Sequence, residues 1–330
     1  MRKILYAAVC TALLLAASGN TWATPAGDQS GPVQGSSTKG FSDVIQPGNQ
    51  PSHYNTDRVV CVSKQINEFI YEIGAEKHLV AHDLTSVYPS QIRKLPSVGY
   101  HRALSAEGII SMQPTTFLTD GNMGPHAVLG QLEEVGIPIK VISPGKTMAD
   151  AQQLMLEVGV FFNREKQAEA VVAQWNSNMA KVMAVSKLWA NQPKPRVVMI
   201  HFGQIINNYL AVTGGPSNQL IEWAGGNNVL ANNHGMERLT PELIADAQPD
   251  VIIANEIAFG RFGSAKAFTQ LPGVSLTPAG KNGRIYKITE QQSIYFGPRT
   301  PKAILQLAKD FHPDVFKAHP ELVKLLDSLP

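Results

Sequence analysis

The feature that most constrains the fold of this chain is one short sequence pattern that occurs twice. Leu104 to Glu107 recurs as Leu239 to Glu242: a Leu, a Ser or Thr, a small residue or Pro, and a Glu. A Ser or Thr in this setting caps a helix, and the Glu then lies in the first helical turn, where the helix dipole favours a carboxylate. In both copies a Pro seven residues after the Glu precedes an apolar run typical of a buried strand. The chain is therefore predicted to contain two related lobes, each with one glutamate, Glu107 or Glu242, in an equivalent place.

Both halves of the chain alternate short apolar, β-rich runs with helical patterns. This alternation, at this spacing, implies a parallel sheet with helices on its faces. The predicted fold class is therefore α/β, with two Rossmann-like lobes that each have a central, mostly parallel sheet. The predicted strands are 59–62, 115–119 and 139–142 in the first half, and 196–201, 209–212, 251–254 and 285–288 in the second.

Between the halves lies a stretch without proline, residues 147–190, in which apolar residues recur at intervals of three and four. If it were helical throughout, it would extend about 60 Å at 1.5 Å per residue. Gly159 and Asn163 are the positions at which it would break. Two lobes joined by a single long backbone helix would have a stiff hinge, and we expect only small lobe motion. The predicted domains are a signal peptide (1–23), a mobile leader (24–56), an N-terminal α/β lobe (57–146), the inter-lobe helix (147–190) and a C-terminal α/β lobe (191–330).

The beginning of the chain has the pattern of a secretory signal peptide. Arg2 and Lys3 precede an apolar run, and small residues then end at Ala23, the expected cleavage site. The apolar run is too short to span a bilayer readily as a transmembrane helix, so we expect a soluble protein in the periplasm. Cys61 is the only cysteine after the cleavage site, so no intramolecular disulfide is expected, and it is predicted to be a buried small hydrophobe.

Charge and composition exclude some partners. The chain has 28 Lys and Arg against 26 Asp and Glu, and it lacks a basic block and a Walker-type glycine loop. We therefore expect neither nucleic acid nor a nucleotide as ligand.

The predicted architecture resembles the helical-backbone class (class III) of periplasmic substrate-binding proteins, which serve ABC importers for vitamin B12, siderophores and haem. In that class, one glutamate on each lobe pairs with arginine pockets on the permease dimer. Glu107 and Glu242 match those glutamates, and an exposed carboxylate at a helix start suits a bidentate arginine. The alternative is that each glutamate only stabilises the start of its own helix.

One segment, Leu95 to Ile109, closely resembles the haem-binding branch of this class, the HmuT, ShuT, PhuT and HutB type. The resemblance extends to Val87-Tyr88-Pro89 and to Gly297-Pro298-Arg299-Thr300-Pro301, so it covers most of the mature chain. In that branch the tyrosine after Val-Gly is the axial ligand to haem iron, and it corresponds here to Tyr100. The resemblance thus implies that Tyr100 ligates the Fe(III) of haem b (protoporphyrin IX), carried as cargo.

The chemistry of Tyr100 supports this role independently. A phenol with a pKa near 10 must lose its proton to ligate ferric iron, and a neighbouring cation helps. In an extended segment alternate side chains share a face, which predicts Arg102 beside the Tyr100 phenolate and His101 pointing away from it. An isolated Gly-Tyr would instead be a half-buried aromatic, with its hydroxyl in a hydrogen bond.

The second lobe is expected to supply the other wall of the cleft. His201 ends a predicted strand, where open α/β sheets bind ligands, so it is a candidate second iron ligand; a histidine that merely caps the strand is the alternative. Arg261, in a predicted loop between Gly260 and Gly263, is a candidate for a haem propionate or an ordinary surface arginine. Tyr209 and Tyr295 are weaker candidates for stacking on the porphyrin.

The predicted function is that of a periplasmic protein that binds ferric haem between its lobes and delivers it to an inner-membrane ABC permease and its ATPase. An outer-membrane haem receptor would be the donor, and the protein is expected to be a monomer and not an enzyme. A siderophore or corrinoid receptor of the same fold is the nearest alternative. A secreted chelatase-like enzyme is a more distant one, because the chain shows no catalytic triad, nucleophile elbow or three-ligand zinc spacing.

Overall fold

The structure is a computed structural model that describes residues 53–202, 209–232 and 235–330. The predicted signal peptide (1–23) and all but the end of the predicted leader (24–56) lie outside these residues. Within the described part of the chain, no helix is both long enough and apolar enough to cross a membrane.

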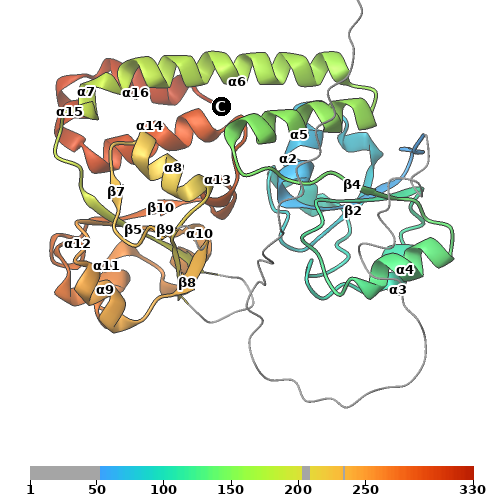
Figure 1. Ribbon diagram of the computed structural model, residues 1–330, viewed down its shortest axis with the longest axis horizontal. Helices are drawn as coiled ribbons and strands as arrows, with labels where there is room; N and C mark the ends of the chain where they lie inside the picture. Colours follow the sequence, from blue (N-terminus) through green and yellow to red (C-terminus); the bar gives the residue numbers. More distant parts are fainter. Residues whose placement is uncertain (1–52, 203–208, 233–234) are drawn as a thin grey trace, which may run out of the picture. The chain divides into compact units, whose positions relative to one another are not determined.

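The first lobe is built on a four-stranded sheet in the order β2-β1-β3-β4, in which every neighbouring pair is parallel, as predicted. Its helices lie on both faces of the sheet (Figure 1). The strands are β1 (Val59–Val62), β2 (Leu79–His82), β3 (Thr116–Thr119) and β4 (Ile139–Val141). The α-helices are α2 (Lys64–Glu72), α3 (Ala106–Ile110) and α4 (Ala127–Glu134), with 3-10 turns at Glu76–His78 and Ser90–Lys94.

The second lobe is built on a mixed sheet in the order β10-β9-β5-β6-β8, with β7 paired to β5. β10, β9 and β5 run parallel, whereas β6 pairs antiparallel with both β5 and β8. The strands are β5 (Arg196–Phe202), β6 (Tyr209–Val212), β7 (Asn227–Asn228), β8 (Met236–Arg238), β9 (Val251–Asn255) and β10 (Ile285–Ile288). The helices are α8 (Pro216–Trp223), α9 (Pro241–Ala247), α10 (Glu256–Phe262), α11 (Ala265–Thr269), α12 (Pro278–Asn282), α13 (Glu290–Ile294), α14 (Thr300–Phe311), α15 (Pro313–Ala318) and α16 (Glu321–Ser328), with a 3-10 turn at Val274–Leu276.

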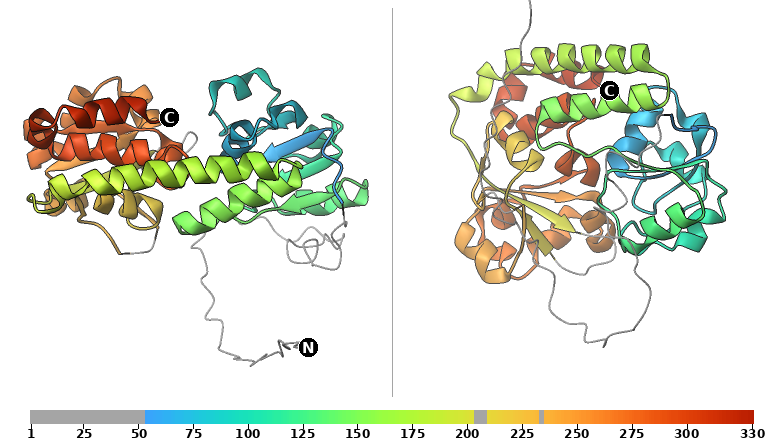
Figure 2. Two further views of the ribbon diagram at one scale, coloured as in Figure 1. Left: turned by 90° about the horizontal axis from the view of Figure 1, so that it is seen from above. Right: turned by 45° about the vertical axis from the view of Figure 1, so that its right-hand side comes forward.

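The predicted stretch of continuous helix over 147–190 is broken into α5 (Met148–Phe161), α6 (Glu165–Val185) and α7 (Lys187–Ala190). The break is at Asn163, whose φ of 54° is incompatible with a right-handed helix. At Gly159, an added Cβ would lie 2.5 Å from Ala168 Cβ, so this glycine allows α5 to pack closely on α6. The stretch is therefore not helical throughout and does not form one helix of about 60 Å; it breaks at one of the two positions expected, and α5 and α6 run side by side (Figures 1 and 2).

A single long helix, α6, nevertheless links the two lobes, as predicted. Near its start Ala168 belongs to the core of the first lobe, together with Phe69 of α2. Further along, Trp175 and Val182 belong to the core of the second lobe. Because one rigid helix contributes to both cores, a change in the angle between the lobes would disturb close packing in at least one of them.

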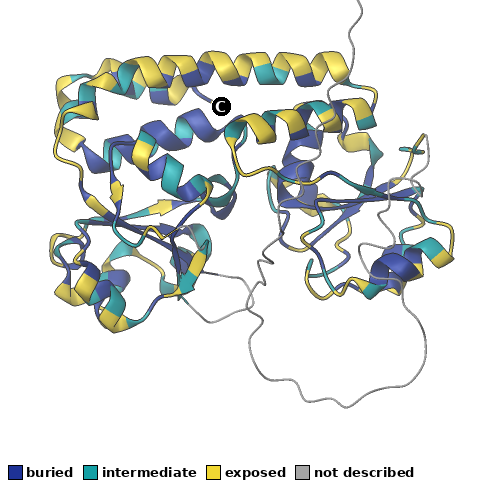
Figure 3. Ribbon diagram, in the orientation of Figure 1, coloured by how far each residue is buried: buried dark blue, intermediate teal, exposed yellow. Residues whose placement is uncertain are grey.

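The sheet of the first lobe is buried on both faces, and the helices carry the solvent-exposed residues (Figure 3). In β1, Val59 and Cys61 face the core formed with α2 and α5, whereas Val60 and Val62 face the core formed with α3 and α4. Cys61 is completely buried, and burial raises the pKa of its thiol. The prediction that Cys61 is a small core residue is confirmed.

Candidate ligand-binding site

The described residues of both lobes line one cavity of about 340 Å³. Part of its polar lining directly follows the carboxyl ends of strands: Ser63 and Lys64 follow β1, Asp83 follows β2, and Asp120 follows β3. The carboxyl ends of parallel strands are where open α/β sheets bind ligands, and here the two sheets present theirs to the same space. The first lobe contributes Val62, Ser63, Lys64, Asp83, Thr85, Tyr100, His101, Arg102, Asp120 and Asn122, and the second His201, Leu210, Met236, Glu290, Ile294 and Tyr295.

Tyr100 lies at the start of a tight turn and not in an extended segment. The N–H of Ala103 donates to the Tyr100 carbonyl at 2.8 Å, and Gly99, with a φ of 97°, supplies the left-handed conformation that leads into the turn. The predicted alternation of side chains was therefore wrong. The His101 ring does not point away from Tyr100, since the two ring centroids are 4.6 Å apart in an edge-to-face arrangement.

His101 is held by a chain of hydrogen bonds that runs from a cation to a buried carboxylate. Arg102 Nε donates to His101 Nε2 at 3.3 Å, which leaves His101 Nδ1 to donate to Thr85 Oγ1 at 3.4 Å. The Thr85 hydroxyl in turn donates to Asp83. Burial lowers the pKa of His101, consistent with the neutral ring that this pattern requires. Arg102 also donates to Asn122 Oδ1 at 3.0 Å, so its guanidinium is fixed at the cavity wall.

The floor of the cavity contains a second buried carboxyl group, that of Asp120. Ser63 Oγ donates to Asp120 Oδ2 at 2.7 Å, and the backbone N–H of Asn122 donates to Asp120 Oδ1 at 2.8 Å. Burial raises the pKa of Asp120. Ser63 also caps α2 by accepting from the Ile66 N–H at 3.3 Å, so one hydroxyl ties the start of this helix to the site.

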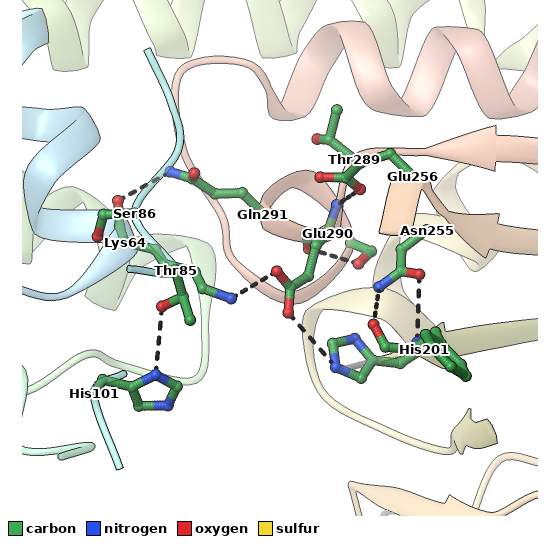
Figure 4. Close-up of polar contacts among 12 residues, drawn as sticks. Lys64, Thr85, Ser86, His101, His201, Asn255, Glu256, Thr289, Glu290 and Gln291 are labelled. Carbon is green, nitrogen blue, oxygen red and sulfur yellow. Dashed lines mark hydrogen bonds and ion pairs between the residues drawn. The ribbon is translucent and has the colours of Figure 1, made fainter. Parts of the chain in front are cut away.

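His201 lines the cavity from the second lobe, at the end of β5, as the sequence suggested for the second wall. Its Nε2 lies 3.5 Å from Glu290 Oε1, while Glu290 Oε2 accepts from Lys64 Nζ at 2.7 Å (Figure 4). Burial lowers the pKa of His201. The His201 side chain of one lobe is thus connected through Glu290 to Lys64 of the other.

Lys64 and Glu290 were missed from the sequence. Both directly follow a capping residue at the end of a predicted strand: Ser63 after β1 and Thr289 after β10. The rule that singled out His201, applied to every strand end, would have found them.

Two other expectations for the second lobe need correction. Arg261 is not in a loop but in the last turn of α10, and it is exposed. Its guanidinium lies over the Phe202 ring, 5.3 Å from the ring centroid, and Arg261 is not part of the cavity lining. Tyr209 stacks on Phe262, with 5.7 Å between the ring centroids, and is also outside the cavity lining. Tyr295 does line the cavity, and burial raises the pKa of its phenol.

The two repeated glutamates have equivalent local structures, as predicted. Glu107 lies in the first turn of α3, where Ser105 Oγ accepts from the Gly108 N–H. Glu242 lies in the first turn of α9, where Thr240 Oγ1 accepts from the Leu243 N–H. Both side chains are exposed, and hydrogen bonds to its own backbone and to Thr240 lower the pKa of Glu242. Two exposed carboxylates at helix starts are thus present outside the cavity.

Comparison with known proteins identifies the family of this fold. The family model described as periplasmic binding protein matches residues 59–292. The chain belongs to the periplasmic binding protein family. It is therefore a binding protein and not an enzyme, and the family places it in the periplasm, as predicted.

Relatives of this periplasmic binding protein carry different ligand names. A vitamin B12-binding protein of Photorhabdus laumondii is 27% identical over 201 residues, which cover 59% of this chain and 70% of the relative. Among solved structures, the apo periplasmic haem-binding protein RhuT from Roseiflexus sp. RS-1 is 27% identical, with a TM-score of 0.71, and the match covers 79% of this chain and 100% of RhuT. A periplasmic haem-binding protein from Pseudomonas aeruginosa is 26% identical, with a TM-score of 0.67 and coverage of 78% and 93%.

A buried ion pair joins the two lobes outside the lining of the cavity. Arg299, which precedes α14, donates to both carboxylate oxygens of Glu68 in α2, at 2.7 and 2.9 Å. The guanidinium also lies 3.5 Å from the centroid of the Tyr88 ring. Arg299 and Tyr88 both belong to segments singled out in the sequence, and here they bind one lobe to the other.

Proposed function

We propose that this periplasmic binding protein carries ferric haem in the cavity between its lobes and delivers it to an inner-membrane ABC permease with its ATPase. The observation that carries the proposal is that Tyr100 of the first lobe and His201 of the second line the same cavity. A phenolate and an imidazole are both ligands of haem iron in proteins. The names of the RhuT and Pseudomonas aeruginosa structures support the same ligand class.

In this proposal Tyr100 is the principal ligand to the iron of haem b. An anionic oxygen suits Fe(III), and the positive charge of the bound iron itself favours loss of the phenol proton. Arg102, two residues away, also lines the cavity, where its guanidinium donates to His101 and Asn122. A single anionic ligand with few other strong contacts also permits release, because only that bond and the flanking contacts have to break. His201 is a candidate second ligand.

Apolar side chains of the lining would cover the macrocycle. Leu210, Met236 and Ile294 come from the second lobe and Val62 from the first. Met236 is 39% exposed, so part of its side chain is accessible to a ligand in the cavity. The cavity volume falls within the range of about 300–1,000 Å³ typical of small-molecule sites.

Two cations remain candidates for the haem propionates. Arg102 lines the cavity at an exposed position, where a propionate could pair with it near the entrance. Arg261 would have to leave the Phe202 ring to do so, and it is the weaker candidate of the two.

Glu107 and Glu242 are proposed to dock the permease. Each is exposed in the first turn of a capped helix, and the two lie in equivalent positions of the two lobes. Arginine pockets on a dimeric permease would accept them in bidentate pairs. The proposal includes export by the signal peptide cleaved near Ala23, an outer-membrane haem receptor as donor, and a monomeric carrier.

A visible absorption titration with hemin tests the ligand. Wild-type protein is expected to shift the Soret band of hemin and to saturate at a countable stoichiometry. Tyr100→Phe should lose at least about tenfold in affinity, equivalent to about 1.4 kcal/mol, and should change the spectrum. Tyr209→Phe is the matched control, since Tyr209 is a half-buried tyrosine outside the cavity lining. An unshifted Soret band in wild type, or identical spectra for Tyr100→Phe and wild type, would contradict the proposal.

A corrinoid is the second candidate ligand, because the Photorhabdus laumondii relative is named a vitamin B12-binding protein. Competition between hemin and cyanocobalamin separates the two. Haem specificity predicts that excess cyanocobalamin leaves the hemin titration unchanged. Displacement of hemin by cyanocobalamin at comparable concentration would favour the corrinoid.

A further inference from the structure

The imidazole of His201 is positioned by Glu290 and does not present a lone pair to the cavity through Nε2. Nε2 lies 3.5 Å from Glu290 Oε1. A bare Nε2 lone pair facing a carboxylate oxygen would be repelled, so the hydrogen of a neutral ring belongs on Nε2, and a protonated ring carries one there as well. In either state Nε2 carries a hydrogen that faces Glu290, and it is not free to bind a metal.

The other ring nitrogen of His201 is equally unable to bind a metal in this conformation. Nδ1 is buried and has no hydrogen-bond partner among the described residues, in a side chain that is only 11% exposed. Burying a polar atom without a hydrogen-bond partner costs free energy. A rearrangement of the ring that gives Nδ1 a partner is therefore favourable when a ligand binds. At 3.5 Å the contact to Glu290 is a long electrostatic contact and not a formed hydrogen bond, and it is therefore weak enough to be exchanged.

Glu290, in contrast, is held firmly. Its Oε2 accepts from Lys64 Nζ at 2.7 Å, and both side chains are 9% exposed. Its backbone N–H donates to Glu256 Oε2 at 2.5 Å, and Thr289 caps the helix in which it lies. The carboxylate therefore keeps its place between the two lobes whether or not His201 contacts it (Figure 4).

We propose that Glu290 is a positioning residue that holds His201 off the haem iron, so that haem entering this conformation is ligated by Tyr100 alone. This inference rests on the proposed haem-binding function. When His201 leaves Glu290 to ligate iron, the Glu290 carboxylate loses its contact with His201 and keeps its ion pair with Lys64. Glu290 thus selects between a one-ligand state suited to release and a two-ligand state suited to retention.

The spin state of bound ferric haem tests the proposal by electron paramagnetic resonance. Wild-type protein is expected to give mainly the high-spin signal of single tyrosinate ligation. The double variant Lys64→Met/Glu290→Ala frees His201 without leaving a buried charge unpaired, and should give mainly a low-spin, six-coordinate signal. Adding His201→Ala to this double variant should restore the high-spin signal.

In the single variant Lys64→Met, Glu290 loses its cation and keeps His201 as its remaining ion-pair contact, so the signal should remain high-spin. A second readout uses the apo protein: nitrogen NMR of labelled histidine, assigned with His201→Ala, should show the Nε2–H form in wild type. Three results would each overturn the inference: a high-spin signal in the double variant, a wild-type signal that is already low-spin through His201, and the Nδ1–H form in the apo wild-type protein. Absence of any Soret shift with wild type would instead overturn the proposed function.

Discussion

Arg58 and Arg196 occupy equivalent positions in the two lobes and perform the same task. Arg58, just before β1, donates from Nε and Nη2 to the carbonyls of Gln113 and Met112, at 2.9 and 2.7 Å. Arg196, the first residue of β5, donates from the same two nitrogens to the carbonyls of Gln248 and Ala247, at 3.3 and 2.7 Å. Each arginine therefore caps the carboxyl end of the helix that carries one of the repeated glutamates.

This relationship extends the internal duplication beyond the glutamates. Gln113 and Gln248 both have a positive φ, of 51° and 41°, where the chain leaves the helix. Both arginines precede a Val-Val pair, a repeat present in the sequence but overlooked there. A cation at a helix carboxyl end satisfies carbonyls that the helix leaves without partners. The lobes thus share a device that fixes each glutamate-bearing helix to its sheet.

The first prediction concerns the repeated glutamates. The variant Glu107→Gln/Glu242→Gln should bind hemin as wild type does but fail to stimulate the ATPase of the reconstituted permease, because the charge for the arginine pockets is gone. Arg58→Ala/Arg196→Ala should reduce stimulation partially, and cost about 1 kcal/mol of unfolding free energy for each arginine. Normal stimulation by the double glutamine variant would show that these glutamates only stabilise their helices.

The second prediction concerns the buried ion pair between the lobes. Arg299→Met leaves the Glu68 carboxylate buried without its cation, with the Gln291 amide as its remaining donor, and should lower the unfolding free energy by about 3–5 kcal/mol in urea denaturation. Glu68→Met/Arg299→Met should regain most of that loss, since no charge remains buried. Arg299→Lys should fall between wild type and Arg299→Met, because a lysine cannot form the bidentate pair or stack on Tyr88. A loss below about 1 kcal/mol for Arg299→Met would argue that the pair is effectively solvated.

The third prediction concerns pH and Asp310, near the end of α14. Burial raises the pKa of this carboxyl to about 6, above the value of about 3.9 expected in the unfolded chain. Between these values the folded state binds more protons, so this group lowers stability as pH rises from about 4 to about 6, with no further change above that. Asp310→Asn should therefore be more stable than wild type at pH 7, by about 2 kcal/mol, and the gain should vanish by about pH 4. Thermal unfolding of both proteins from about pH 4 to pH 7 measures this gain in stability. A gain that does not change with pH would refute the raised pKa of Asp310.

The fourth prediction uses two glycines with nearly the same backbone conformation. Gly263 has φ 82° and Gly273 has φ 81°, but an added Cβ meets nothing within 4 Å at Gly263 and lies 2.2 Å from the Pro241 carbonyl oxygen at Gly273. Gly263→Ala should cost only the conformational strain of about 1–2 kcal/mol. Gly273→Ala should cost more in urea denaturation, and should also impair ATPase stimulation, because it displaces the start of α9 next to Glu242. Equal costs for the two variants would mean that the clash relaxes freely.

Much of the lobe architecture followed from local patterns. Parallel strands could be located from short apolar runs such as Val59–Val62, and the capped helix starts before Glu107 and Glu242 from the spacing of Ser or Thr, Glu and Pro. These features depend on interactions within a few residues, so they are encoded locally. The sequence offered Asn163 only as a possible break in the helix. Its positive φ is stable because α5 packs back on α6, and that packing has no local sequence signal.

The site was less accessible to sequence reasoning. Tyr100, Arg102 and His201 were located, but the turn that brings His101 onto the Tyr100 ring replaced the extended segment expected there. Arg261 was assigned to a loop because its flanking glycines suggested one, whereas the aromatic packing around Phe202 and Phe262 stabilises a helix.

The sequence by itself determined two duplicated α/β lobes, a long connecting helix, the candidate ligands Tyr100 and His201, and one glutamate at a helix start in each lobe. Only the tertiary structure decided which distant side chains meet. Lys64 and Glu290 pair at 2.7 Å across 226 residues of sequence, and Glu68 pairs with Arg299 across 231. Such pairs have no local signature, because neither charge is stabilised until folding buries the two together and excludes water from between them.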